Sequence, residues 1–308
     1  MIRLKIGRHL LTLGLFLILT GLIIYRQEDI LTIINTYIAP NKNITLTYNE
    51  YYRDKDFLYV QNTTNFNATS YQDLINIFYT SLNAGESSFT FYCPKDYKNC
   101  LNDVKDIANN SNILSTVNNY VHPYNGFSNI ETEINNLGRV TFTFIKSYRQ
   151  TEIDEINKKI EEVYPTLVQD NKREIDNIKS VHDYIINITK YDTNKSLNPE
   201  DLSYKSDIAY GPLFEGYALC GGYTDLMALF LEKMGIPNFK ISSDNHIWNA
   251  VYINDKWYHL DLTWDDPVSQ DGKDYLEENY FLIDTNELLK QDKTEHNFNI
   301  EYYKEFEQ

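Results

Sequence analysis

Two alternating apolar segments separated by a two-residue polar break constrain the fold of this chain more than any other feature. The segments are HIWNAVYI (residues 246–253) and KWYHLDLTW (256–264), and the break is Asn254-Asp255. Side chains alternate across a strand with period two, and Asn-Asp is a usable hairpin turn, although weaker than Asn-Gly. The pattern predicts an antiparallel hairpin.

The length of the turn decides which side chains share a face of this hairpin. With two turn residues, Trp248 lies opposite Asp261, and His246 becomes the diagonal neighbour of Asp261 on the same face. A loop one residue longer would place His246 and Asp261 on opposite faces. The two-residue turn therefore predicts an imidazole within reach of a carboxylate.

A cysteine precedes the hairpin in the segment GYALCGGYTDLMALFLEKMG, where Cys220 begins a predicted helix. The positive end of the helix dipole and the unpaired N–H groups there favour a thiolate over a thiol. We expect Gly221 and Gly222 to leave the backbone uncovered beside the sulfur. A substrate carbonyl could then approach, and the Cys220 N–H could bind an oxyanion.

These three side chains have the types needed for acyl transfer: Cys220 attacks, His246 takes and returns the proton, and Asp261 orients the imidazole. A competing interpretation is a metal site, formed by Cys220, His246, His259 and Asp261. Close ligand pairs such as C-x-x-C and calcium loops are missing from the sequence, so we expect no metal and no cofactor.

The segment GYALCGGYTDLMALFLEKMGIP, followed by HIWNAVYINDKWYHLDLTWDDP, resembles the core of the transglutaminase-like superfamily, whose members carry a papain-like Cys, His, Asp triad in this order. The resemblance covers roughly residues 175–298 and implies that Cys220, His246 and Asp261 form that triad. It also implies site-shaping residues, namely Trp248, Asn249, Trp264 and Asp265, with Tyr191 as the second oxyanion donor and Tyr210 as its alternative.

The order of elements predicts an α+β fold, because helices come before paired strands in the C-terminal half. We divide the chain into residues 1–26, a membrane anchor or signal segment; 40–150, a small α/β unit of unknown role; and 151–308, the papain-like catalytic domain. In the middle unit, residues 71–84 predict a helix with a core-facing stripe, and strands are expected near 89 and from 139.

The N-terminus carries a membrane signal. Residues 10–25 are sixteen residues without a charge, preceded by Arg3, Lys5 and Arg8 and closed by Arg26. The run spans roughly 24 Å, and flanking arginines can snorkel to the interface. An uncleaved anchor with the body outside the cell is favoured, and a cleaved signal peptide is the alternative.

The net charge of −16 argues against nucleic-acid binding, since the first 26 residues hold four basic residues and the remaining chain is more acidic still. Three cysteines rule out a disulfide-dense scaffold, although Cys93 and Cys100 could close a small loop outside the cell. Cys220 is then left unpaired and is a candidate reactive thiol.

These features predict a cell-surface cysteine peptidase or amidase that acts on a peptide or protein, with cell-wall material among the candidate substrates. One alternative is a crosslinking transglutaminase, in which an amine replaces water as the acceptor. Another is a non-catalytic surface module that keeps this fold for binding. Neither the substrate nor the oligomeric state follows from the sequence.

Overall fold

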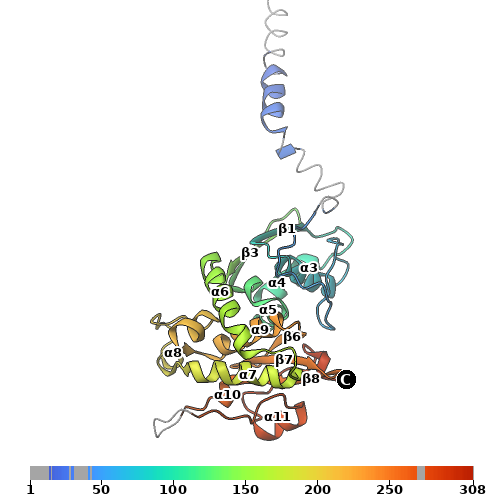
Figure 1. The fold of residues 1–308 in the computed structure, drawn as a ribbon. Coiled ribbons are helices and arrows are strands. Elements are labelled where there is room, and N and C mark those ends of the chain that lie inside the picture. Colours follow the sequence, from blue (N-terminus) through green and yellow to red (C-terminus); the bar gives the residue numbers. More distant parts are fainter. Residues whose placement is uncertain are drawn as a thin grey trace, which may run out of the picture.

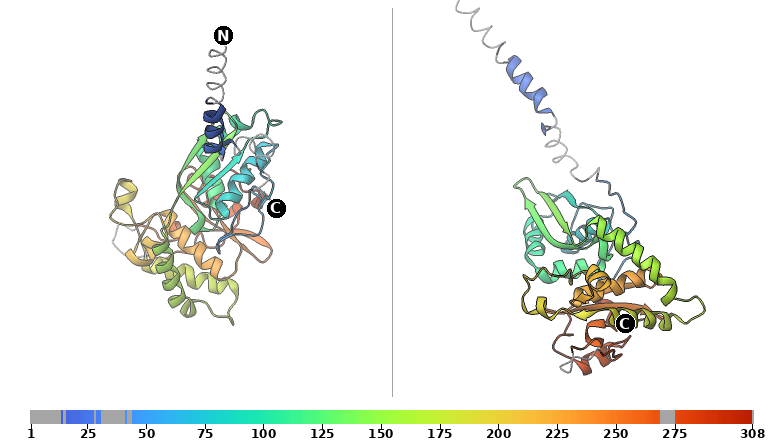
Figure 2. Two further views of the ribbon diagram at one scale, coloured as in Figure 1. Left: turned by 90° about the horizontal axis from the view of Figure 1, so that it is seen from above. Right: turned by 60° about the vertical axis from the view of Figure 1, so that its left-hand side comes forward.

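A computed structural model describes residues 14, 16–27, 29–30, 41, 44–268 and 275–307, and the chain stacks a small α/β part on a larger one (Figures 1 and 2). None of the helices in these ranges is both long and apolar enough to cross a membrane. Residues 16–25 are helical, but residues 10–13 and 15 of the predicted span lie outside the described residues.

The N-terminal part is a three-stranded antiparallel sheet covered by helices. Its strands β1 (Ser88–Tyr92), β2 (Phe127–Ile134) and β3 (Arg139–Lys146) lie in the order β1-β3-β2. The helices are α3 (Tyr71–Asn83), α4 (Cys100–Asn109) and α5 (Ser111–Tyr120), followed by the turn η1 (Pro123–Asn125). A capping box between Ser70 and Asp73 begins α3, and Phe78 of that helix packs on Phe142 and Phe144 of β3. The helix and both strands predicted here are confirmed.

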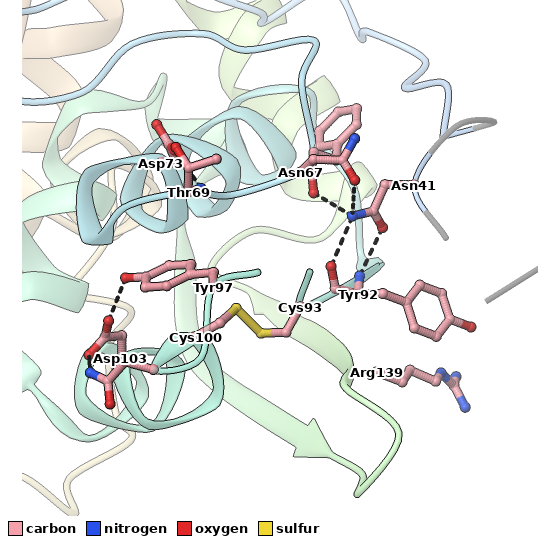
Figure 3. The surroundings of a disulfide bond; sticks show 12 residues. Asn41, Asn67, Thr69, Asp73, Tyr92, Cys93, Tyr97, Cys100, Asp103 and Arg139 are labelled. Carbon is pink, nitrogen blue, oxygen red and sulfur yellow. Dashed lines mark hydrogen bonds between the residues drawn. A yellow bond between two sulfur atoms is a disulfide. The ribbon is translucent and has the colours of Figure 1, made fainter. Parts of the chain in front are cut away.

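A disulfide closes the loop between β1 and α4 (Figure 3). Cys93 and Cys100 are joined with their Cα atoms 5.7 Å apart, as the sequence predicted. Beside it, the Asn41 side chain pairs with the backbone of Tyr92 like a neighbouring strand: it donates to the carbonyl oxygen and accepts from the N–H, both over 2.9 Å. These contacts tie the beginning of the described body to the edge of the sheet.

The C-terminal part is built around a second antiparallel sheet, β6 (Asn238–Ser242), β7 (Ile247–Ile253) and β8 (Lys256–Leu260) in that order. Asn254 and Asp255 have φ values of 52° and 60°, which make the predicted two-residue turn. The main helices are α6 (Gln150–Leu167), α7 (Glu174–Ile188) and α9 (Cys220–Lys233). Short elements connect them: β4 (Lys190–Tyr191), α8 (Thr193–Leu197), η2 (Gly211–Glu215), β5 (Tyr217–Ala218), α10 (Leu262–Asp265), α11 (Thr285–Gln291) and η3 (Lys304–Glu307).

Both faces of the second sheet are buried. On one face, Val251 and Ile253 share an apolar core with Leu226 and Phe230 of α9. On the other face, Phe239 and Trp248 join the core that the N-terminal part and the C-terminal tail form, and α5 packs on β6. The proposed boundary near residue 150 coincides with the start of α6, but it does not divide two separate cores.

Candidate active site

Cys220 is the first residue of α9, and the backbone around it is crowded. A Cβ on Gly221 would lie 2.7 Å from the carbonyl oxygen of Asp207, and one on Gly222 would lie 2.4 Å from that of Ser206. The two glycines are therefore needed for close backbone packing, and the expectation that they leave their backbone uncovered is wrong. No side chain caps the helix at Leu219, and as the first helical residue Cys220 has no intrahelical acceptor for its N–H.

The hairpin register brings His246 to Asp261. Ile253 pairs with Lys256 and Asn249 with Leu260, which is the pairing that a two-residue turn predicts. One step further along, His246 Nε2 lies 2.5 Å from Asp261 Oδ2, with both side chains almost fully buried. The predicted contact is therefore present, and it depends on the length of the turn.

His246 also interacts with the Cys220 side chain. Burial by itself lowers the pKa of His246, but the negative charge of Asp261, its hydrogen bond, and a hydrogen bond with the Cys220 side chain raise the pKa to about 10. Because Nε2 faces Asp261, the ring leaves Nδ1 for the thiol. The structure thus brings the side chains of Cys220, His246 and Asp261 together.

Asp261 is held from several sides. Its Oδ1 accepts from the backbone N–H groups of Thr263 (2.9 Å) and Trp264 (3.3 Å) at the start of α10, and its Oδ2 accepts from His246 and from His296 (2.9 Å). Burial would raise the pKa of Asp261, but the charge and hydrogen bonds of the two histidines hold it well below its usual range. The carboxylate is therefore ionised and rigid.

His296 is the site residue that the sequence analysis missed. It is fully buried, lies 35 positions after Asp261 and belongs to no local motif that marks it. Among the described residues, His246, Asp261 and His296 could offer metal-ligating atoms within 4.8 Å of one another. Both histidine contacts with Asp261 have hydrogen-bond lengths, whereas ligand atoms around a tetrahedral zinc ion lie ~3.3 Å apart.

Four predicted site-shaping residues surround this line without touching the sulfur in any described contact. The Trp248 ring stacks on His246 with centroids 5.6 Å apart, and the Trp264 ring lies 5.4 Å from that of His296. Asn249 donates to the carbonyl oxygen of Thr224 and thereby ties β7 to α9. Asp265 is buried and accepts from the Tyr280 N–H, and its Oδ2 lies 3.1 Å from His182 Nε2. These residues act by packing and anchoring.

Three further residues have described hydrogen bonds with partners other than Cys220, His246 and Asp261. The Tyr191 hydroxyl donates to Ser196, 3.3 Å away, and the Tyr210 hydroxyl is hydrogen-bonded with Glu155, so a role in an oxyanion hole stays a prediction for both. His259, from the alternative metal set, lies between Trp248 and Thr285 instead of on Cys220.

Residues 161–262 match the family model of the transglutaminase-like superfamily, and this stretch includes Cys220, His246 and Asp261. No sequence among the curated proteins matches the chain. One similar solved structure, described as a TGase, is 19% identical over 48% of each chain, with a TM-score of 0.31. Another, from Cytophaga hutchinsonii and provisionally named a cysteine protease, is 13% identical over 44% of this chain and 61% of its own, with a TM-score of 0.28. The chain spans less than two thirds of either structure, and likenesses this remote carry no argument about function.

Proposed function

We propose that the protein transfers acyl groups of peptides or proteins through a thioester on Cys220. The observation that carries the proposal is the continuous line from Cys220 through His246 to Asp261. Cys220 Sγ attacks the acyl carbon, and His246 passes the thiol proton to the leaving amine. Water or a second amine then resolves the thioester, while Asp261 holds the imidazole in place.

The backbone N–H of Cys220 is the oxyanion donor that we propose. It lies at an uncapped helix N-terminus, where a developing negative charge is stabilised by the free N–H groups and by the helix dipole. Because the neighbouring backbone crowds Gly221 and Gly222, a substrate must approach the sulfur from another side.

We favour water as the acceptor, which makes the protein a peptidase or amidase at the cell surface. A Cys93–Cys100 disulfide is suited to an oxidising compartment. The apolar side chains of Phe16, Leu17 and Ile18 are about two-thirds exposed (66%, 65% and 65%), as a membrane-embedded helix would require. The disulfide supports a body outside the cell, and the exposed apolar side chains support attachment to a membrane.

The test uses the full chain in detergent with a mixture of quenched fluorescent peptides and, separately, a glutamine peptide with a fluorescent primary amine. Peptide cleavage that disappears in Cys220→Ala supports the hydrolase. Incorporation of the amine without cleavage would replace it with a crosslinking enzyme. Neither activity, together with slow alkylation of Cys220 by iodoacetamide at neutral pH, as for an ordinary thiol, would favour a binding module.

A further inference from the structure

A second buried histidine lies behind the triad, between two carboxylates. His296 Nε2 is 2.9 Å from Asp261 Oδ2, and His296 Nδ1 is 2.9 Å from Asp292 Oδ2. The contacts continue the line of the triad, so that it runs Cys220, His246, Asp261, His296, Asp292. Its members come from the start of α9, from the residues just before β7 and just after β8, and from the segment after α11.

Both ring nitrogens of His296 face carboxylate oxygens. An ionised carboxylate only accepts, so a ring nitrogen that faces one must carry a hydrogen. Hydrogen bonds from the histidines hold the pKa of Asp261 below its usual range, and donors from Thr294, Glu295 and His296 do the same for Asp292 against the effect of burial. Both carboxylates are therefore acceptors, and each ring nitrogen of His296 lies where it can donate to one of them.

The surroundings hold this ring in one orientation. The Tyr280 ring stacks on it with centroids 5.1 Å apart and 16° between planes, and Trp248 meets it edge-on at 4.9 Å. Asp292 is fixed by the turn that follows α11, where it accepts from the N–H groups of Thr294, Glu295 and His296. A ring so enclosed cannot turn away from Asp261.

We propose that His296 is a positioning residue, a buried imidazolium that clamps Asp261 and offsets part of its negative charge. The inference rests on the proposed function, in which His246 must return its proton to the leaving group. Without the His296 cation, Asp261 would stabilise the His246 imidazolium alone and make it a weaker acid. The titratable groups that face His296 and Asp261 are His246 before β7, His259 on β8, Asp265 at the end of α10, Tyr280, and Asp292 after α11.

The first test needs no substrate. In the full chain with ¹⁵N-labelled histidine rings, His296 should show two protonated ring nitrogens at pH 7, assigned by the loss of its signals in His296→Gln. A signal typical of a neutral ring, with one unprotonated nitrogen, would overturn the proposal. This measurement also covers the case in which His296→Gln does not fold, because Asp292→Asn then provides the assignment through its altered signal.

The second test follows alkylation of Cys220 by iodoacetamide against pH. The alkylation rate should change at the alkaline pH at which the His246 imidazolium loses its proton and the ion-paired thiolate becomes a free thiolate. Ring centroids of His246 and His296 are 5.2 Å apart, so loss of the His296 charge in His296→Gln should move this change to higher pH by about one pH unit. Turnover should fall in the same variant. A merely structural defect would lower turnover and the alkylation rate together, without moving the pH at which the alkylation rate changes. His259→Gln, which removes another buried histidine outside this line, is the matched control.

The outcomes separate this inference from the proposed function, since neither readout requires turnover. A change in alkylation rate at the same alkaline pH in His296→Gln and His259→Gln would overturn the inference even if peptide cleavage is found. One equivalent of bound zinc that is lost in His296→Gln would replace the clamp with a metal site. A change in alkylation rate displaced to higher pH in His296→Gln, with no turnover on any peptide, would support the inference and count against the hydrolase.

Discussion

Trp248 donates its indole Nε1–H to Nδ1 of His259 over 3.0 Å. Because Nδ1 is the acceptor, His259 carries its hydrogen on Nε2, which faces Thr285 Oγ1 at 3.0 Å. Burial, and then the positive charge of His296, lower the pKa of His259 to about 3. His259 is thus a neutral structural histidine, although it shares its strand face with Asp261.

Substitution of His259 should therefore affect stability and not chemistry. His259→Ala leaves the Trp248 N–H buried without an acceptor and should reduce the free energy of unfolding by about 1–3 kcal/mol. His259→Gln can still accept that hydrogen bond and should recover part of the loss. Urea unfolding and turnover per folded molecule check this. If the wild type binds zinc and a folded His259→Gln variant loses both the zinc and the activity, the metal interpretation would be revived.

The pH dependence of stability should have opposite signs for the two histidines. The pKa of His259 is depressed to about 3, so its contribution is complete above pH ~6.5 and is lost as the pH falls, at up to about 1.4 kcal/mol per pH unit. The pKa of His246 is raised to about 10, so its contribution is complete below pH ~6.5 and is lost as the pH rises through 10. The free energy of unfolding of His259→Gln should depend less on pH in acid than that of the wild type, and the free energy of unfolding of His246→Gln should depend less on pH in alkali. Curves parallel to the wild type would contradict both assignments.

The triad should behave as one unit. Cys220→Ala should abolish turnover, and His246→Ala should fall nearly as far because the thiol loses its proton acceptor. The double variant should be hardly worse than Cys220→Ala alone. Asp261→Asn should lose less, up to about 10⁴-fold, since Asn still holds the ring but does not stabilise its charge. A fully active Cys220→Ala enzyme would end the thioester mechanism.

Residues 151–308 should not be stable alone. Without the N-terminal part, Phe239 and Trp248 lose the apolar side chains that cover their face of the sheet, and Tyr120 no longer donates to the Tyr302 carbonyl oxygen. The fragment should aggregate, whereas residues 40–308 should remain monodisperse in gel filtration. A soluble, cooperatively unfolding fragment 151–308 would show that the catalytic part is an independent domain.

The anchor proposal predicts a chain that begins near Met1 and stays with membranes in high salt, because hydrophobic attachment is insensitive to screening. Detergent should release it. N-terminal sequencing of the released protein checks the outcome. A soluble chain that begins between residues 25 and 40 would instead show a cleaved signal.

Local patterns were sufficient for much of the fold and for the triad. The alternation on either side of Asn254-Asp255 determined the register, and the register determined that His246 meets Asp261, because side-chain period and turn length together leave one pairing. The helix that Cys220 begins is likewise predicted by its apolar stripe. The Cys93–Cys100 pairing required only a short loop with turn-forming residues.

Other features depended on residues far apart in the chain. His296 reaches Asp261 only because the segment after α11 folds back over β8, and no periodicity near residue 296 points to that contact. The crowding of Gly221 and Gly222 by Ser206 and Asp207 is equally invisible in the local pattern. The sequence by itself determined the hairpin, the helix that begins at Cys220 and the contact of His246 with Asp261, since these follow from short-range periodicity. Tertiary structure alone decided which buried charges face one another and that the N-terminal part shares an apolar core with one face of the second sheet, because such contacts depend on how distant elements pack.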